Sequence, residues 1–137
     1  MEELIKRLHQ ENCSCVISNH GTIRSFHLRG VADLYDLLCN EPDFLQGASI
    51  ADKVVGKAAA ALMILGGVES LHADIISDLA LDLLRQKNMK VEYDLSVPHI
   101  INRTQTDWCP MEKLCLSEAS PESIRVIIRD FLESMRK

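Results

Sequence analysis

The sequence predicts an α/β fold with a mixed sheet and helices on both faces. Short apolar segments alternate with helical patterns between residues 48 and 98, and strands separated by single helices pair in parallel. Near the N-terminus, Asn-His-Gly at 19–21 separates two strand-like segments, which predicts an antiparallel hairpin. The predicted sheet therefore has a hairpin at one side and parallel strands beside it.

Length and composition predict one domain, over residues 1–137. The chain has 137 residues and is 47% hydrophobic, which is enough for one core and too little for two domains. Its formal net charge is -5, with lysines and arginines scattered along the chain, and this disfavours nucleic acid as a partner.

A cytoplasmic protein is expected from three further features. The N-terminus lacks the pattern of a signal peptide, and the longest apolar run, 58–68, is too short to span a membrane. The five cysteines are interpreted as reduced thiols, as is usual in that compartment. We therefore expect no membrane association.

The elements of the N-terminal half follow from their periodicity. Residues 2–11 place apolar side chains on one face and charges opposite, which predicts an amphipathic helix. Residues 13–18 and 22–28 are predicted as the two hairpin strands, and 30–40 as a second helix. Proline and glycine then interrupt the pattern over 41–47.

The C-terminal half alternates strand and helix, with predicted strands at 48–52, 68–76 and 90–98. Between them lie an alanine-rich helix over 54–66 and a helix over 77–88. Ser77 or Asp78 is suited to the N-cap of the second helix, and Asn88 to a left-handed residue at its end. The alanine-rich helix has no bulky face, so we expect it at the centre of the domain.

The remaining sequence combines an irregular segment with a clear final helix. Residues 99–119 fit no regular pattern, and a connection of that length in a compact domain is often functional. Ser120 followed by Pro121 is typical of a helix start.

Three charged residues lie at the start of the alanine-rich helix. Asp52 is expected to cap backbone amides, Gly56 leaves bare backbone, and Lys53 and Lys57 fall on one side of a helix. Free amides, the positive end of the helix dipole and an ammonium would together bind an anion. The alternative is an ordinary capped helix with both lysines extended into solvent.

A phosphate-binding loop of the Walker type is excluded at this place. That motif requires a glycine five residues before Gly56 and a hydroxyl after the lysine. The chain has Ala51 and Ala58 there, so we exclude a nucleoside triphosphatase of this kind.

A second group of polar residues lies in the irregular segment. Asn102, Arg103, Cys109 and Glu112 fall close together there, with the single tryptophan of the chain, and such loops above an α/β scaffold often bind ligands. Cys109 would be a nucleophile if a nearby cation lowered its pKa. The alternative is a surface loop anchored by a buried cysteine.

The histidine and cysteine patterns do not predict a metal site. His72 and Asp74, with Cys109 and Cys115, only partly resemble the zinc deaminase signature, because the acid and the cysteine spacing differ. A zinc site at His99, Cys109 and Cys115 lacks a fourth ligand. We therefore expect no metal and no cofactor, and a redox or metal sensor using the two cysteines is the weaker alternative.

Three segments together resemble a known family: "GVADLYDLL", "ASIADKVVGKAAAALMILGGV" and "VPHIINRTQTDWCPMEKLCL". They are similar to a family of small, stand-alone prokaryotic proteins of unknown function with a cytidine-deaminase-like fold. The resemblance runs from about residue 12 to the final helix. It implies a three-layer αβα sandwich, in agreement with the predicted elements, and no established activity.

The resemblance also implies where a pocket lies. In true deaminases the zinc ligands stand at the starts of two helices, where this chain has Val55 to Ala58 and the segment from Ser77. Because these lack the zinc ligands, hydrolytic deamination is expected to be absent.

The leading hypothesis is therefore a metal-free deaminase-fold protein that binds a small polar or anionic ligand, such as a nucleotide or nucleobase. Asp52, Lys53, Gly56 and Lys57 would form one side of its site; Asn102, Arg103, Cys109 and Glu112 would form the other.

The competing hypothesis is a non-catalytic interaction module, with a homodimer formed through an exposed sheet edge as one form. In that case Lys57 and Arg103 would pair with Asp52 and Glu112, leaving no cavity between them.

Overall fold

A computed structural model describes residues 1–28, 31–101 and 107–135. Its strands are β1 (Cys15–Asn19), β2 (Thr22–Phe26), β3 (Ser49–Val55), β4 (Ser70–Ser77) and β5 (Lys90–Val97). Its helices are α1 (Glu2–Gln10), α2 (Ala32–Asn40), α3 (Pro42–Leu45), α4 (Lys57–Gly66), α5 (Asp78–Leu84), α6 (Pro110–Cys115) and α7 (Pro121–Met135).

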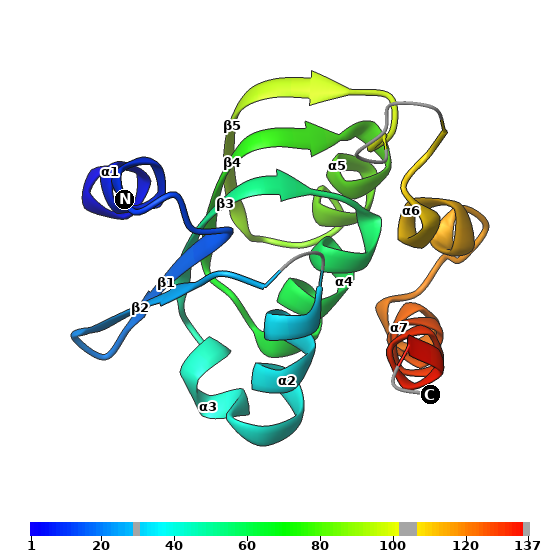
Figure 1. The fold of residues 1–137 in the computed structure, drawn as a ribbon, viewed down its shortest axis with the longest axis horizontal. Helices are drawn as coiled ribbons and strands as arrows, with labels where there is room; N and C mark the ends of the chain where they lie inside the picture. The colour runs from blue at the N-terminus through cyan, green and yellow to red at the C-terminus, as the bar shows by residue number, and fades with distance from the viewer. Residues whose placement is uncertain (29–30, 102–106, 136–137) are drawn as a thin grey trace.

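The predicted mixed α/β sheet is confirmed. The five strands lie in the order β2-β1-β3-β4-β5, as Figure 1 shows. β1 pairs antiparallel with both β2 and β3, whereas β3, β4 and β5 run parallel. The hairpin therefore forms one side of the sheet, and the parallel strands form the other.

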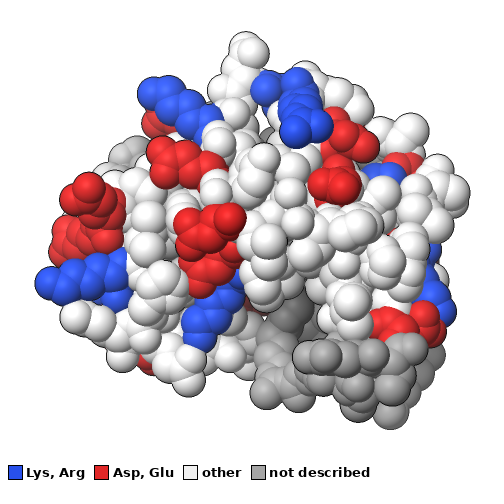
Figure 2. All heavy atoms as spheres, turned by 90° about the horizontal axis from the view of Figure 1, so that it is seen from above, with Lys and Arg blue, Asp and Glu red and all other residues white. Residues whose placement is uncertain are grey.

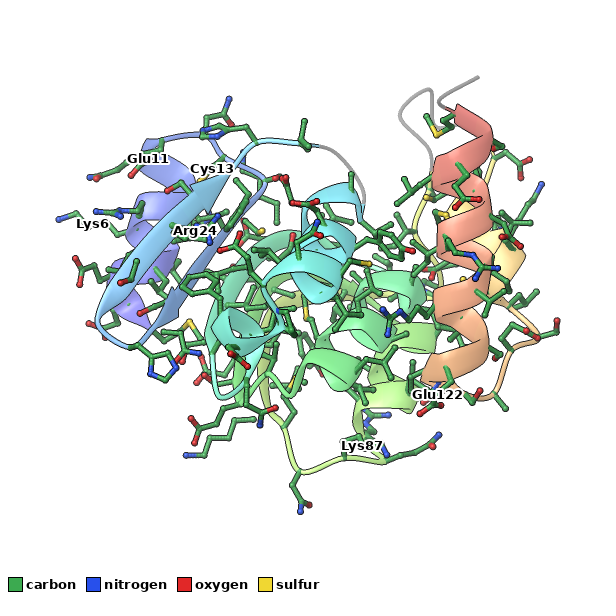
Figure 3. All side chains as sticks on the ribbon, turned by 90° about the horizontal axis from the view of Figure 1, so that it is seen from below. Lys6, Glu11, Cys13, Arg24, Lys87 and Glu122 are labelled. Carbon is green, nitrogen blue, oxygen red and sulfur yellow. The ribbon has the colours of Figure 1, made fainter. Side chains whose placement is uncertain are left out.

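Helices lie on both faces of the sheet (Figure 1). α1 packs across β1 and β3 on one face, where Leu4 and Leu8 join a small core with Val16 and Ala51. Its polar side faces outward, and Lys6 points away from the sheet in Figure 3. The burial of this leucine pair holds α1 in place.

α4 is the central helix of the opposite face, as its composition predicted. It contacts α2, α5, α6 and α7, and every residue from Lys57 to Met63 is buried. A Cβ on Gly66 would lie 2.8 Å from Leu45 Cδ1, so only glycine permits this approach of α3 to α4. Small residues thus allow α4 to be surrounded.

The start of α4 differs from the predicted 54–66 helix. Val54 and Val55 belong to β3, where they pair with Ile75 and Ile76 of β4, and the N-cap is Gly56. Asp52 therefore lies within the strand and does not cap the helix. The strand extends further because β-branched residues pack well in a sheet.

α5 also ends earlier than predicted. It ends at Leu84 with Arg85 as its C-cap in a right-handed conformation, whereas Asn88 was expected to close it in the left-handed one. Among the described residues, positive φ outside glycine occurs at Asn12 and His20. Asn88 is therefore not a left-handed cap, and the residues after Leu84 form turns.

Ser77 is confirmed as the N-cap of α5, and its loss should measurably destabilise the fold. Its hydroxyl is fully buried and accepts a hydrogen bond from the amide of Ala80 at 3.1 Å. Ser77→Ala should lower the free energy of unfolding by about 1 kcal/mol in urea titrations. The matched control is Ser117→Ala, at an exposed turn; an equal loss in both variants would contradict this role.

The final segment contains one element that periodicity did not predict. α6 forms one short helix within residues 99–119, and Ser120 begins α7 by accepting a hydrogen bond from the amide of Ser123 at 3.2 Å. α6 and α7 lie against α4, on the side away from the sheet (Figure 1). α6 therefore reaches the start of α4.

The described residues were compared with the features of membrane-spanning and nucleic-acid-binding proteins. None of the described helices combines the length and apolar character needed to cross a membrane. On the face shown in Figure 2, the described lysines and arginines alternate with acidic side chains and form no continuous basic patch.

Candidate functional site

A cavity of about 510 Å³ lies where β3 ends and α4 begins. Ligands in α/β folds bind outside the carboxyl ends of parallel strands, and β3 is such a strand. Its apolar lining comes from the start of α2, β3, α4, α6 and the segment before α6: Val31, Val54, Ala58, Ala59, Ile100, Ile101 and Met111. An organic molecule of nucleoside size would fit this volume.

Five of the predicted site residues line this cavity: Asp52, Lys53, Gly56, Cys109 and Glu112. Lys57 is not among the lining residues. Asn102 and Arg103 lie outside the described residues. The structure thus brings the end of β3 and the start of α6 together, as the hypothesis required, although they are more than fifty residues apart.

Among the ionisable groups that line the cavity, Asp52 is the one whose pKa is clearly shifted. Its side chain is buried, and loss of hydration raises its pKa from 3.8 to about 7. The nearby charge of Asp74 adds to this rise, while hydrogen bonds from the amides of Val54 and Lys53 oppose it. Near neutral pH, Asp52 can therefore either donate or accept a hydrogen bond toward a ligand.

Glu112 joins three segments that are distant in the sequence. One carboxylate oxygen accepts a hydrogen bond from the amide of Lys57 at 2.7 Å, and the other accepts one from the amide of Ile100 at 2.9 Å. Only 2% of its surface is exposed. A carboxylate at this place satisfies a free amide at the positive end of α4.

Gly56 leaves room for this contact. A Cβ at residue 56 would lie 3.1 Å from the nearer carboxylate oxygen of Glu112, which is closer than most side-chain contacts. Glycine therefore serves here to admit a protein carboxylate to the helix start. The sequence-based interpretation assigned the same glycine to bare backbone facing a ligand.

Lys57 has a different environment from the one predicted. Its side chain is buried, and Nζ donates a hydrogen bond to the carbonyl of Leu116, just after α6, at 3.2 Å. Lys53 is on β3, and its ammonium donates to the side chain of Asn12. The two lysines therefore do not share a helix side, and the first amide of α4 is already bonded to Glu112.

Of the internal ion pairs expected of an interaction module, those of Lys57 are not formed, whereas those of Arg103 lie outside the described residues. In residues 1–28, 31–101 and 107–135, Lys57 makes no ion pair with Asp52 or Glu112. The cavity lies beside both acids.

The two cysteines of the final segment differ in accessibility. Cys109 is partly exposed and lines the cavity, so a bound ligand would contact its thiol. Cys115 is fully buried, and loss of hydration raises its pKa to about 11, which makes it a poor nucleophile.

The zinc arrangements considered from the sequence are not assembled in the described part of the chain. His99 stacks on Trp108 with ring centroids 3.8 Å apart, and it does not gather with Cys109 and Cys115 into a ligand group. The first turns of α4 and α5 contain no histidine or cysteine. The donor set at those helix starts therefore does not fit deaminase zinc.

The other residues that line the cavity were not predicted as site residues, and three of them illustrate why. Val31 and Ser14 line the cavity from other parts of the chain, and no local pattern marks them. Met111 was detectable in principle, because it lies between Pro110 and Glu112 in a segment already considered functional.

Comparison with known proteins gives a family and a solved structure. Residues 3–132 match a family described as "TM1506: Domain of unknown function (DUF1893)". The chain is similar to a solved DUF1893 family protein from Thermotoga maritima, with a TM-score of 0.86 and 27% identity, covering 94% of this chain and 87% of the other. No protein with a curated description matches the chain.

Proposed function

Because the chain belongs to the DUF1893 family, whose function is unknown, we propose a function from the cavity itself. We propose that the cavity binds a small heterocyclic ligand, such as a nucleobase or nucleoside, that exchanges a hydrogen bond with Asp52. In this proposal the protein has a deaminase-like fold, and its site works without zinc at the helix starts.

One observation carries the proposal: a buried carboxyl with a raised pKa faces a mostly apolar cavity. Ligand sites commonly combine apolar walls with a few polar groups that fix orientation, and perturbed acids concentrate at functional sites. In this proposal, apolar side chains of β3, α4 and α6 contact the faces of a flat ring. An amino or ring N–H group on it would donate to the ionised form of Asp52.

An anionic ligand has less support from the described residues. The amide that would bind an anion at the start of α4 already donates to Glu112, and Lys57 donates to Leu116. Asp52 and Glu112 are both carboxyl groups on the cavity wall, and an ionised carboxylate repels a phosphate. We therefore favour a neutral or cationic heterocycle.

The proposal can be tested by ligand screening together with thiol protection. Calorimetry with nucleobases, nucleosides and sugar phosphates should give binders among the first two classes, and Asp52→Asn should weaken those with amino groups by about tenfold. A binder should also slow alkylation of Cys109, which lines the cavity, while exposed Cys39 on α2 reacts as before.

Three results would contradict this function. The first is the absence of any binder among the nucleobases and nucleosides. The second is a binder whose affinity is unchanged in Asp52→Asn and that leaves Cys109 alkylation unchanged. The third is a preference for sugar phosphates over nucleosides, which would favour the anionic interpretation.

An interaction module is the second candidate, and β5 is the observation in its favour. β5 is an edge strand whose residues are all at least partly exposed, and Tyr93 and Leu95 are 43% and 53% exposed. Such an edge can pair with another chain.

A further inference from the structure

A second group of ionisable side chains lies on the α1 side of the sheet. His72 and Asp74 lie two residues apart on β4, so they share a face. β4 pairs with β5 so that Ala73 lies beside Tyr93, which places Asp94 next to Asp74. One ligand atom from each of His72, Asp74 and Asp94 lies within 4.8 Å of the others.

The distances within this group suit a shared cation. His72 Nε2 lies 3.2 Å from Asp74 Oδ1 and 3.9 Å from Asp94 Oδ2. Atoms that ligate one metal at about 2.0–2.2 Å lie at comparable distances from one another. The two carboxylates also supply the negative charge that would balance a divalent ion.

His72 is the buried member of the group, and one of its ring nitrogens has no hydrogen-bond partner among the described residues. Its side chain is 6% exposed, and the unpartnered atom is the buried Nδ1. With the proton on Nδ1, the Nε2 lone pair faces two carboxylate oxygens; with the proton on Nε2, Nδ1 is left bare. Nδ1 points away from the two carboxylates and is unpartnered in either tautomer, so the support for a cation comes from Nε2. With the proton on Nδ1, a cation between Nε2 and the carboxylate oxygens would offset the repulsion of their lone pairs.

His9, on α1, contacts this group through Asp74. Its Nε2 lies 2.7 Å from Asp74 Oδ2, within hydrogen-bond distance. The other oxygen of Asp74 therefore remains directed toward His72. Partners of this kind orient metal-binding carboxylates and are often needed for affinity.

We propose that His72 Nε2, Asp74 and Asp94 bind a divalent transition-metal ion of the zinc type. One imidazole and two carboxylates are ligands that such ions accept, and three protein ligands leave coordination positions for water. Asp94 is 68% exposed at its side chain, which provides an entry path to the buried histidine. None of these three residues lines the cavity, so the proposal does not rest on the proposed function.

Calorimetric titration of the reduced full chain with Zn²⁺ tests the site. We expect one equivalent to bind, with Asp94→Asn and His72→Gln each weakening the affinity by about tenfold or more. His27→Gln is the matched control, because His27 is an exposed histidine outside the group, and it should bind as the wild type does. Asp94→Asn changes an exposed edge residue, so folding should be retained, which circular dichroism verifies.

Cysteine binding is the outcome that must be distinguished, because the chain has five thiols. Co²⁺ at the proposed site should show no thiolate-to-metal charge-transfer absorption, since its ligands are nitrogen and oxygen. Such an absorption at one equivalent, or equal affinity in wild type and Asp94→Asn, would overturn the proposal. Lack of Zn²⁺ binding by the wild type would overturn it as well.

Discussion

Replacing Glu112 with alanine should lower the free energy of unfolding by about 3 kcal/mol, because two buried amides would lose charge-assisted hydrogen bonds. The amides of Lys57 and Ile100 both donate to this carboxylate, which is almost fully buried. Urea denaturation at pH 7 measures the change.

Two further variants isolate the role of the Glu112 carboxylate. Glu112→Gln keeps the shape but offers one acceptor, so its loss should be smaller than that of Glu112→Ala. Glu133→Gln changes an exposed glutamate on α7 and should stay within about 0.5 kcal/mol of the wild type. If Glu112→Ala behaved like Glu133→Gln, the bridging role assigned to Glu112 would be wrong.

Replacing Asp52 with asparagine should stabilise the protein above neutral pH. The folded-state pKa of Asp52 is about 7 rather than 3.8, so the folded state binds the proton more tightly than the unfolded state does. Stability from the protonated carboxyl is complete below pH 3.8 and is lost as the pH rises through 7. The rise in pKa corresponds to about 4 kcal/mol as an upper value.

Thermal or urea unfolding at pH 5 and pH 8 measures this effect. Asparagine can still accept the hydrogen bond from the amide of Val54, which lies 3.3 Å from Asp52 Oδ1. Because the wild-type carboxyl is mostly ionised at pH 8 and mostly protonated at pH 5, the gain in stability in Asp52→Asn should be larger at pH 8. Asp43→Asn, at an exposed carboxyl on α3, is the control and should remain close to the wild type. Equal gains at both pH values in Asp52→Asn would contradict the raised pKa.

If Asp52→Asn is stabilising at pH 8 and Asp43→Asn is not, then ionised Asp52 lowers the stability of the folded protein. Residues of this kind are typically retained for function. The stability measurement would thus support the cavity as a functional site without any ligand being known.

The sequence predicted the fold well because its strongest patterns are local. The Asn-His-Gly turn and the alanine run are readable from neighbouring residues, and both lie where predicted. The predicted boundary at Asp52 was wrong because an aspartate there is compatible with either a helix cap or a strand. The pairing of Val54 and Val55 with β4 extends the strand past it. Tertiary pairing of this kind leaves no local signal.

Part of the cavity lining was predicted from the sequence, but the contacts of its residues were not. Asp52, Gly56, Cys109 and Glu112 do line one cavity. The environment of Lys57 was not predictable, because α4 starts at Lys57 and not at Val54, and each residue of a helix changes the direction of the side chain by about 100°. That Glu112 bonds to the amide of Lys57 depends on packing between segments 55 residues apart.

The bridge at Glu112 has a consequence for how the molecule folds. The first amide of α4 donates to a residue 55 positions later in the chain, so this bond forms only after a long loop has closed, at a cost in chain entropy. Non-local closures of this kind slow folding. A nascent chain that ends before residue 112 therefore lacks both the acceptor for this amide and the part of the cavity wall that α6 supplies.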